Sequence, residues 1–234
     1  LAADKGVAGM ILRIDQTVSR TAQQFEVYRG DTLLYTGMLG RLSRRQSICM
    51  EDSRGIPVAE GTYVPPKITA FFPLLHWFGI PQTSRQLYCR RNGGEWAAFS
   101  LRRCGWLKQQ YVLRLAQAQM VCQAYPLCRG RFAYIPIYQD NLQIALVEHY
   151  LTTVDNRNRY KLYLLDDFAR CSDELAFFTL YYDSWTRTRS VSLPGEATAA
   201  VSWTLTRYAR RYQPDWRQNH FPQENFFGKT SLLQ

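Results

Sequence analysis

The sequence lacks the short motifs that mark nucleotide-binding and hydrolytic sites. No G-x-x-x-x-G-K-S/T loop, no G-x-G-x-x-G fingerprint and no G-x-S-x-G elbow occurs in its 234 residues. It contains 3 histidines, which are scattered along the chain. The sequence therefore offers no positive sign of a nucleotide, dinucleotide or serine-hydrolase site. We expect a protein that is not an enzyme and that needs no cofactor.

The 6 cysteines do not form a metal-binding pattern. None stands in a C-x-x-C pair, and Cys122 and Cys128, which lie closest together, have no histidine near them. A structural zinc site needs clustered Cys and His ligands at short spacing. The chain is also far longer than the small domains that disulfides hold together. We expect reduced, buried thiols and no metal.

Long apolar runs are missing as well. A membrane-spanning helix needs about 20 apolar residues, whereas the longest candidates, 68–81 and 175–182, are too short or are interrupted by proline. Residues 1–9 carry no basic region followed by an apolar core, so we expect no signal peptide there. These observations favour a soluble protein of the cytoplasm, which could also lie at the periphery of a membrane.

Positive charge is abundant. The net charge is +10, and arginine supplies most of it. Arginine's planar fork suits phosphates and carboxylates, so this composition permits anionic partners, although a solvated arginine-rich surface is the plainer interpretation. Residues 37–45 form the densest basic turn, with two glycines ahead of Arg41, Arg44 and Arg45. These arginines are the candidate anion-binding residues, and an exposed hairpin end is the alternative.

Short apolar alternations separated by turn signals fill most of the chain. Residues 25–36 read as a hairpin around Gly30-Asp31, and residues 86–102 as another around Asn92-Gly93-Gly94. Further strands are predicted at 46–50, 111–115, 119–125, 131–138, 142–151 and 159–165. No βαβ alternation and no repeat of fixed period is present. The pattern favours a mainly-β protein, either an antiparallel barrel or a sandwich.

Residues 172–186 break this alternation and favour a helix. Ser172 is a suitable N-cap, and Asp173 and Glu174 place negative charge in the first turn, where the helix dipole favours it. Residues 175–182 are apolar on nearly every face, so such a helix must be buried on all sides. A buried strand is the alternative, because Phe-Phe-Thr-Leu-Tyr-Tyr has high β propensity.

Two other segments also depart from the strand pattern. Residues 195–212 carry one apolar stripe at helical spacing and lie between Pro194 and Pro214, which predicts an amphipathic helix, and the aromatic tail after it should dock on the protein. The proline-containing stretch 71–81 is the most apolar loop. It could plug one end of a barrel or form an exposed binding loop, and its His76 is expected to be a packed side chain.

The order of these elements resembles the tubby C-terminal-like superfamily, which includes tubby proteins, LURP-one-related proteins and phospholipid scramblases. Residues 160–168, followed by 175–183, are similar to bacterial members of this kind, and residues 25–35 with the basic hairpin up to Met50 resemble the opening strands of the LURP-one-related pattern. The similarity covers roughly residues 20–190 and consists of layout and short runs.

The resemblance implies a closed antiparallel β-barrel around a central hydrophobic helix. It divides the chain into a lead segment 1–20, a barrel 21–190 with its buried helix at 172–186, and an amphipathic helix and aromatic tail at 191–234 on the same domain. Tubby proteins bind phosphoinositides through basic residues, which implies an acidic lipid head group as a ligand here. No motif carries those binding positions over to this sequence.

The sequence thus favours a non-enzymatic barrel that binds an anionic ligand, a lipid head group or a protein partner. One alternative is an enzyme whose site is assembled from dispersed residues such as Glu148, His149 and Asp155, although their spacing offers no support. The other alternative is a basic nucleic-acid-binding protein, which rests on charge and aromatic content alone.

Overall fold

The computed structural model describes residues 9–18, 23–40, 47–64, 83–103, 109–124, 126–129, 132–150, 157–186 and 212–223. The basic-turn residues Arg41, Arg44 and Arg45 lie outside these ranges. So do Asp155, the loop 71–81 with His76, and the predicted amphipathic helix except for its last residue, Tyr212.

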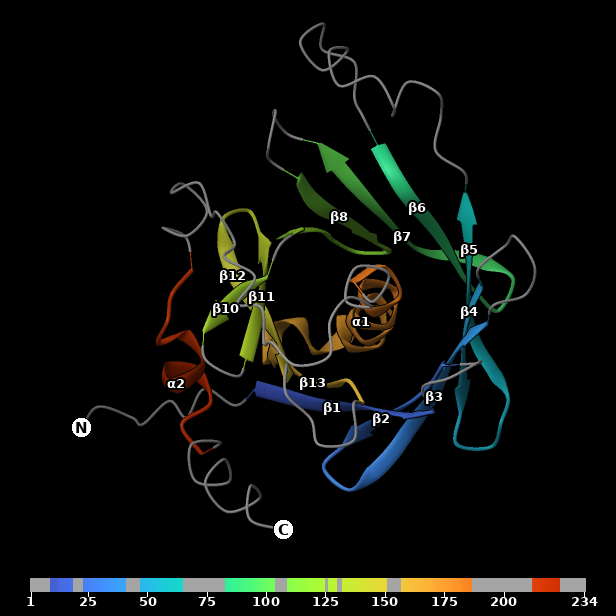
Figure 1. Cartoon of the computed structure of the whole chain (residues 1–234), viewed down its shortest axis with the longest axis horizontal. Helices are drawn as coiled ribbons and strands as arrows, with labels where there is room; N and C mark the ends of the chain where they lie inside the picture. The colour runs from blue at the N-terminus through green and yellow to red at the C-terminus, as the bar shows by residue number, and fades with distance from the viewer. Residues whose placement is uncertain are drawn as a thin grey trace, which may run out of the picture.

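The described strands form one antiparallel sheet that closes into a twelve-strand barrel, with a helix in its interior (Figure 1). The strands are β1 (Gly9–Val18), β2 (Gln23–Arg29), β3 (Thr32–Gly40), β4 (Ser47–Asp52), β5 (Pro57–Val64), β6 (Thr83–Arg91), β7 (Gly94–Arg103), β8 (Gln109–Leu115), β9 (Gln119–Gln123), β10 (Leu127–Arg129), β11 (Phe132–Gln139), β12 (Leu142–Tyr150) and β13 (Arg159–Leu165). The barrel expected from the resemblance is confirmed, and the sandwich is not.

The barrel closes where β11 meets two strands on one edge. The first half of β11 pairs with the short β10, with Leu127 opposite Tyr134. Its second half pairs with β9, with Cys122 opposite Ile137. Since β9 and β10 pair with different halves of the same edge of β11, the pairing of β9 with β11 closes a barrel of twelve strands. β10 is an additional short strand.

The N-terminal stretch is part of the wall, and its assignment as a lead segment was wrong from Gly9 onward. Strand β1 pairs with β2 on one side and with β13 on the other, so the first and last strands lie side by side. Leu12 and Ile14 are buried, whereas Arg13 and Asp15, which alternate with them along the strand, are more exposed. That alternation is visible in the sequence, and period-two counting over 9–18 would have found the strand.

The buried helix extends over the predicted residues. α1 (Ser172–Thr186) runs inside the barrel, and seven of its apolar side chains from Leu175 to Tyr182 have almost no solvent exposure. The predicted N-cap was wrong, however. Ser172 has helical backbone angles (φ −60°, ψ −41°) because a 3₁₀-helix, η3 (Asp166–Cys171), leads directly into α1. A capping residue has non-helical angles, so the helical segment starts at Asp166.

Aromatic packing joins α1 to the wall. The Phe99 and Tyr111 rings of β7 and β8 meet Phe178 nearly edge-on, at centroid distances of 5.4 and 5.7 Å. Edge-to-face pairs of this kind are favourable beyond the area they bury. The hydrophobicity of α1 is therefore explained by enclosure inside the strands.

A second, smaller layer covers part of the outer face. α2 (Trp216–His220) lies outside the barrel (Figure 1), where Trp216 and Phe221 bury themselves against Leu146 and Tyr163. The Trp216 indole also donates a hydrogen bond to the Gln143 carbonyl, at 3.1 Å. Strands β12 and β13 are thus covered on both faces here, which explains their nearly continuous apolar runs. Neither α1 nor α2 combines the length and the hydropathy of a membrane-spanning helix.

Candidate functional site

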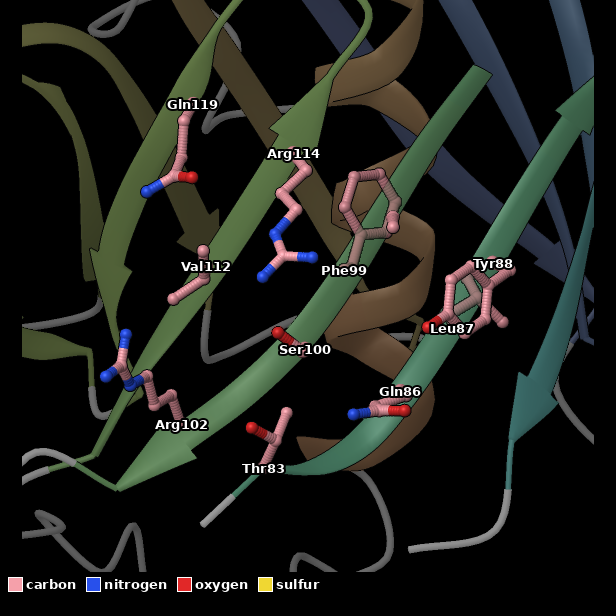
Figure 2. A pocket seen from close by; sticks show the side chains of 11 residues that line it. Thr83, Gln86, Leu87, Tyr88, Phe99, Ser100, Arg102, Val112, Arg114 and Gln119 are labelled. Carbon is pink, nitrogen blue, oxygen red and sulfur yellow. The ribbon is translucent and has the colours of Figure 1, made fainter. Parts of the chain in front are cut away.

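A groove of about 240 Å³ lies on the outer face of the barrel, over β6, β7 and β8 and the start of β9. In Figure 2, α1 passes behind these strands, which places the groove on the side away from the core. The tubby-like resemblance and the basic turn did not point to this face. We treat it as the candidate site because it combines a hollow with a distinctive set of side chains.

Small side chains form the floor. Ala98 and Ser100 face outward from β7, the middle strand, while their neighbours Phe99 and Leu101 face the core. Ser100 lies opposite Val112 of β8, whose side chain is 7 % exposed, and Ala98 lies opposite Arg114. Because the two outward residues of the central strand are small, larger side chains on both sides stand above them and leave a hollow.

Two arginines provide the charge of the groove. Arg102 and Arg114 are exposed, and the other nine of the eleven lining residues are uncharged. In Figure 2 the Arg114 side chain extends along the strands toward Val112 and Ser100. A guanidinium presents several N–H donors in a fixed plane, which suits the oxygens of phosphate and carboxylate. The local charge is therefore positive, with the Arg114 guanidinium over the small-residue floor and the Arg102 guanidinium at the edge of the groove, pointing away from Ser100 (Figure 2).

Neutral polar groups complete the rim. Gln119 of β9 pairs with Arg114, and Thr83 of β6 pairs with Arg102. Tyr88, opposite Ala98, keeps 44 % of its surface exposed and forms an aromatic side wall. Hydroxyl and amide groups at these positions can donate hydrogen bonds to a ligand that the arginines attract.

A β-bulge shapes the β6 side of the groove. Ser84 pairs with Leu101 and Leu87 with Phe99, so two residues of β6, Arg85 and Gln86, lie opposite one residue of β7. Arg85 has a φ of +52°, which is unusual for a residue with a side chain. In a regular strand, alternation counted back from the buried Leu87 would turn Thr83 toward the core. The extra residue keeps Thr83 on the outer face.

The enzyme alternative named Glu148 and His149, and the structure places them on opposite faces of β12. Glu148 lies under α2, fully buried, and accepts hydrogen bonds from Tyr163 at 3.0 Å and from Arg217 at 2.9 Å. Neighbouring residues of a strand point to opposite sides of the sheet. The two side chains therefore do not form a common site, and Asp155 lies outside the described residues.

His149 belongs to a polar cluster that ties α1 to the wall. Its ring stacks on Tyr160 with centroids 4.4 Å apart and lies 3.3 Å from the Asn158 amide oxygen. Asn158 and Tyr160 both donate to the buried Asp183 carboxylate of α1, the latter at 2.5 Å. Both hydrogen bonds go to Oδ1 of this buried carboxylate near the C-terminal end of the helix and join it to β13 and the residue before it, so a structural role explains the cluster.

The thiols behave as core side chains. Cys89, Cys122 and Cys171 are buried and Cys49 is half-buried, and all four are free. Burial raises the pKa of each thiol, most strongly for Cys89 and Cys122, and so disfavours the reactive thiolate. Within the part of the chain that the structure describes, no three His, Cys, Asp or Glu side chains gather as a metal ion would require.

The sequence predictions missed Arg102, Arg114 and Ser100 as a group. The strands β7 and β8 were both predicted, but the turn residues do not determine which side chains of different strands lie together in the groove. The outward alternation of Ala98, Ser100 and Arg102 was the available signal.

Comparison with protein-family models, with curated proteins and with solved structures finds no match to this chain. The class of protein is therefore defined by its own architecture, a mainly-β closed barrel with an interior helix. Membership in the tubby C-terminal-like superfamily stays a prediction.

Proposed function

We propose that this protein is a non-enzymatic binding protein that holds an anionic group in the outer groove. The observation that carries the proposal is the pair of exposed arginines, Arg102 and Arg114, in one groove with a floor of small side chains. Hydrogen bonds that involve an ionised partner are stronger than neutral ones. An anion entering this groove would meet two such donors together with the Ser100 hydroxyl.

A phosphate-bearing head group fits the size and chemistry of the groove. A volume of about 240 Å³ is below the range typical of pockets for drug-sized ligands, so one compact group is a better match than a large molecule. The groove is also open on the barrel surface, which a head group projecting from a membrane requires. The resemblance to tubby proteins points to the same ligand class, and an acidic side chain of a protein partner would use the same donors.

The basic turn supplies a second proposed contact. Arg41, Arg44 and Arg45 follow β3 in the sequence, whereas Arg102 and Arg114 belong to β7 and β8. We therefore propose the turn as an additional electrostatic contact, with the groove as the specific site.

Vesicle co-sedimentation tests the proposal. Wild-type protein is mixed with phosphatidylcholine vesicles, with and without added anionic phospholipid, and glycerol phosphate serves as a soluble competitor. We expect binding only to the anionic vesicles. The double variant Arg102→Ala/Arg114→Ala should lose about tenfold or more in affinity, because hydrogen bonds to charged groups contribute about 1.5–3 kcal/mol each.

The matched control is Arg29→Ala/Arg54→Ala, which removes the same charge from exposed hairpin positions away from the groove. It should retain most of the binding. Equal weakening by both double variants would mean that net charge, and not the groove, attracts the vesicles. Direct binding of glycerol phosphate, measured by calorimetry, together with no vesicle binding would instead identify a soluble phosphate as the ligand.

A further inference from the structure

We propose that Tyr181 of the buried helix is a positioning residue for the outer groove, and that it acts through the bulge at Arg85. The inference rests on the proposed function, since it concerns how the same groove obtains its shape. The helix would then do more than fill the barrel interior, because one of its side chains fixes the β6 backbone that carries the groove residues Thr83 and Gln86.

The first observation is a hydrogen bond from inside the barrel to the bulge. The Tyr181 hydroxyl donates to the main-chain carbonyl of Arg85. Carbonyls of a regular strand lie in the plane of the sheet and bond to a neighbouring strand. Arg85 has no partner residue in the β6–β7 register, and its carbonyl is bonded to the helix instead. Tyr181 is fully buried, so its hydroxyl cannot turn to solvent for a substitute partner.

The second observation concerns the side chain of the same residue. The Arg85 guanidinium carbon lies 4.6 Å from the centre of the Trp185 ring, a cation–π contact. Tyr63 of β5 braces both helix residues: its ring stacks on Tyr181 at 6.0 Å and meets Trp185 edge-on at 5.5 Å. The backbone and the side chain of Arg85 are therefore both held by α1.

These contacts offset an unfavourable backbone conformation. Arg85 adopts a φ of +52°, which side-chain-bearing residues avoid unless their surroundings hold them there. The bulge in turn keeps Thr83 opposite Arg102 and places Gln86 beside Ser100 on the outer face. If the hydroxyl contact is lost, the bulge can relax, and Thr83 and Gln86 shift relative to the two arginines.

The test compares Tyr181→Phe with Tyr63→Phe. Both remove one hydroxyl from neighbouring stacked rings, but the Tyr63 hydroxyl contacts Ser184 at 2.6 Å and does not contact the bulge. We expect Tyr181→Phe to weaken binding to anionic vesicles about fivefold, which corresponds to the net contribution of one hydrogen bond. Tyr63→Phe should leave the binding unchanged. Amide hydrogen exchange over 83–88 should accelerate in Tyr181→Phe alone.

A rescue separates positioning from general loss of stability. Glycine adopts positive φ without strain, so Arg85→Gly should keep the bulge without the help of Tyr181. The double variant Tyr181→Phe/Arg85→Gly should therefore bind like Arg85→Gly. A variant Tyr181→Phe with unchanged affinity overturns the inference, as does failure of the rescue. If wild type binds no anion, the proposed function is wrong, and exchange over 83–88 alone then decides whether Tyr181 holds the bulge.

Discussion

Arg217 of α2 donates to both carboxylate oxygens of Glu148, at 2.9 and 3.2 Å, and Glu148 has no solvent exposure. The pair attaches the C-terminal segment to the barrel wall. We predict that Arg217→Ala lowers the free energy of unfolding by about 3–5 kcal/mol, because it leaves a buried charge without its partner. Urea denaturation followed by tryptophan fluorescence measures the change.

The control for this pair is Arg217→Ala/Glu148→Gln, which removes both charges. Most of the lost stability should return, because a neutral amide is far less costly to bury than an unpaired carboxylate. A single variant that loses less than about 1 kcal/mol would show that the pair behaves like an exposed salt bridge.

Gly37 of β3 allows α1 to approach the wall. A Cβ placed at this glycine would overlap a methyl carbon of Leu180, which is fully buried. We expect Gly37→Ala to destabilise the protein by about 1–3 kcal/mol, the usual cost of overpacking a filled core. Thermal or chemical unfolding checks the value. Adding Leu180→Val should recover part of the loss, since it removes volume at the point of contact.

Gly94→Ala provides the comparison for Gly37→Ala. The atom nearest to a Cβ at Gly94 is the Arg91 carbonyl oxygen at 3.7 Å, an ordinary contact. This variant should stay within about 0.5 kcal/mol of wild type. Equal losses at the two positions would mean that contact with the helix does not determine the cost.

The acidic first turn of α1 makes stability depend on pH. Burial raises the pKa of Glu174 above its ordinary value of 4.5; Asp173 raises it further and Arg91 lowers it. A carboxyl with a raised folded-state pKa favours the folded protein at low pH, and its contribution falls as pH rises from about 4.5 through that pKa. We therefore expect Glu174→Gln to be more stable than wild type at neutral pH.

The difference between Glu174→Gln and wild type should shrink as pH falls and be smallest below 4.5, where the carboxyl becomes protonated in both states. Urea titrations at several pH values measure it. Glu95→Gln, the same substitution at an exposed position, is the control for the change of side chain. A Glu174→Gln variant less stable than wild type at neutral pH would contradict the prediction.

Local chemistry made the strands and the helix predictable. The hairpins at Gly30-Asp31 and Asn92-Gly93 form as predicted, and Gly30, Asn92 and Gly93 have positive φ, as such turns require. The extent of α1 was also correct, because a segment apolar on nearly every face has to be enclosed. The cap at Ser172 was not, because the preceding 3₁₀-helix depends on how 166–171 leave β13, which no local propensity specifies.

The candidate site could not be predicted in the same way. Arg102 and Arg114 are twelve positions apart in sequence, and they share one hollow only because β7 and β8 pair in one register. Thr83 faces outward because of a bulge whose carbonyl is bonded by Tyr181, ninety-six residues from Arg85.

The sequence by itself therefore determined the strand alternation, the turns and the need to bury 175–182, since each depends on neighbouring residues and on solvent. Only the tertiary structure decided that β1 and β13 lie side by side, that Glu148 is covered by α2, and that two arginines share a groove on the outer face. These features depend on long-range pairing and on which element covers each face of a strand. Period-two alternation separates the two faces of a strand but does not determine what covers either of them.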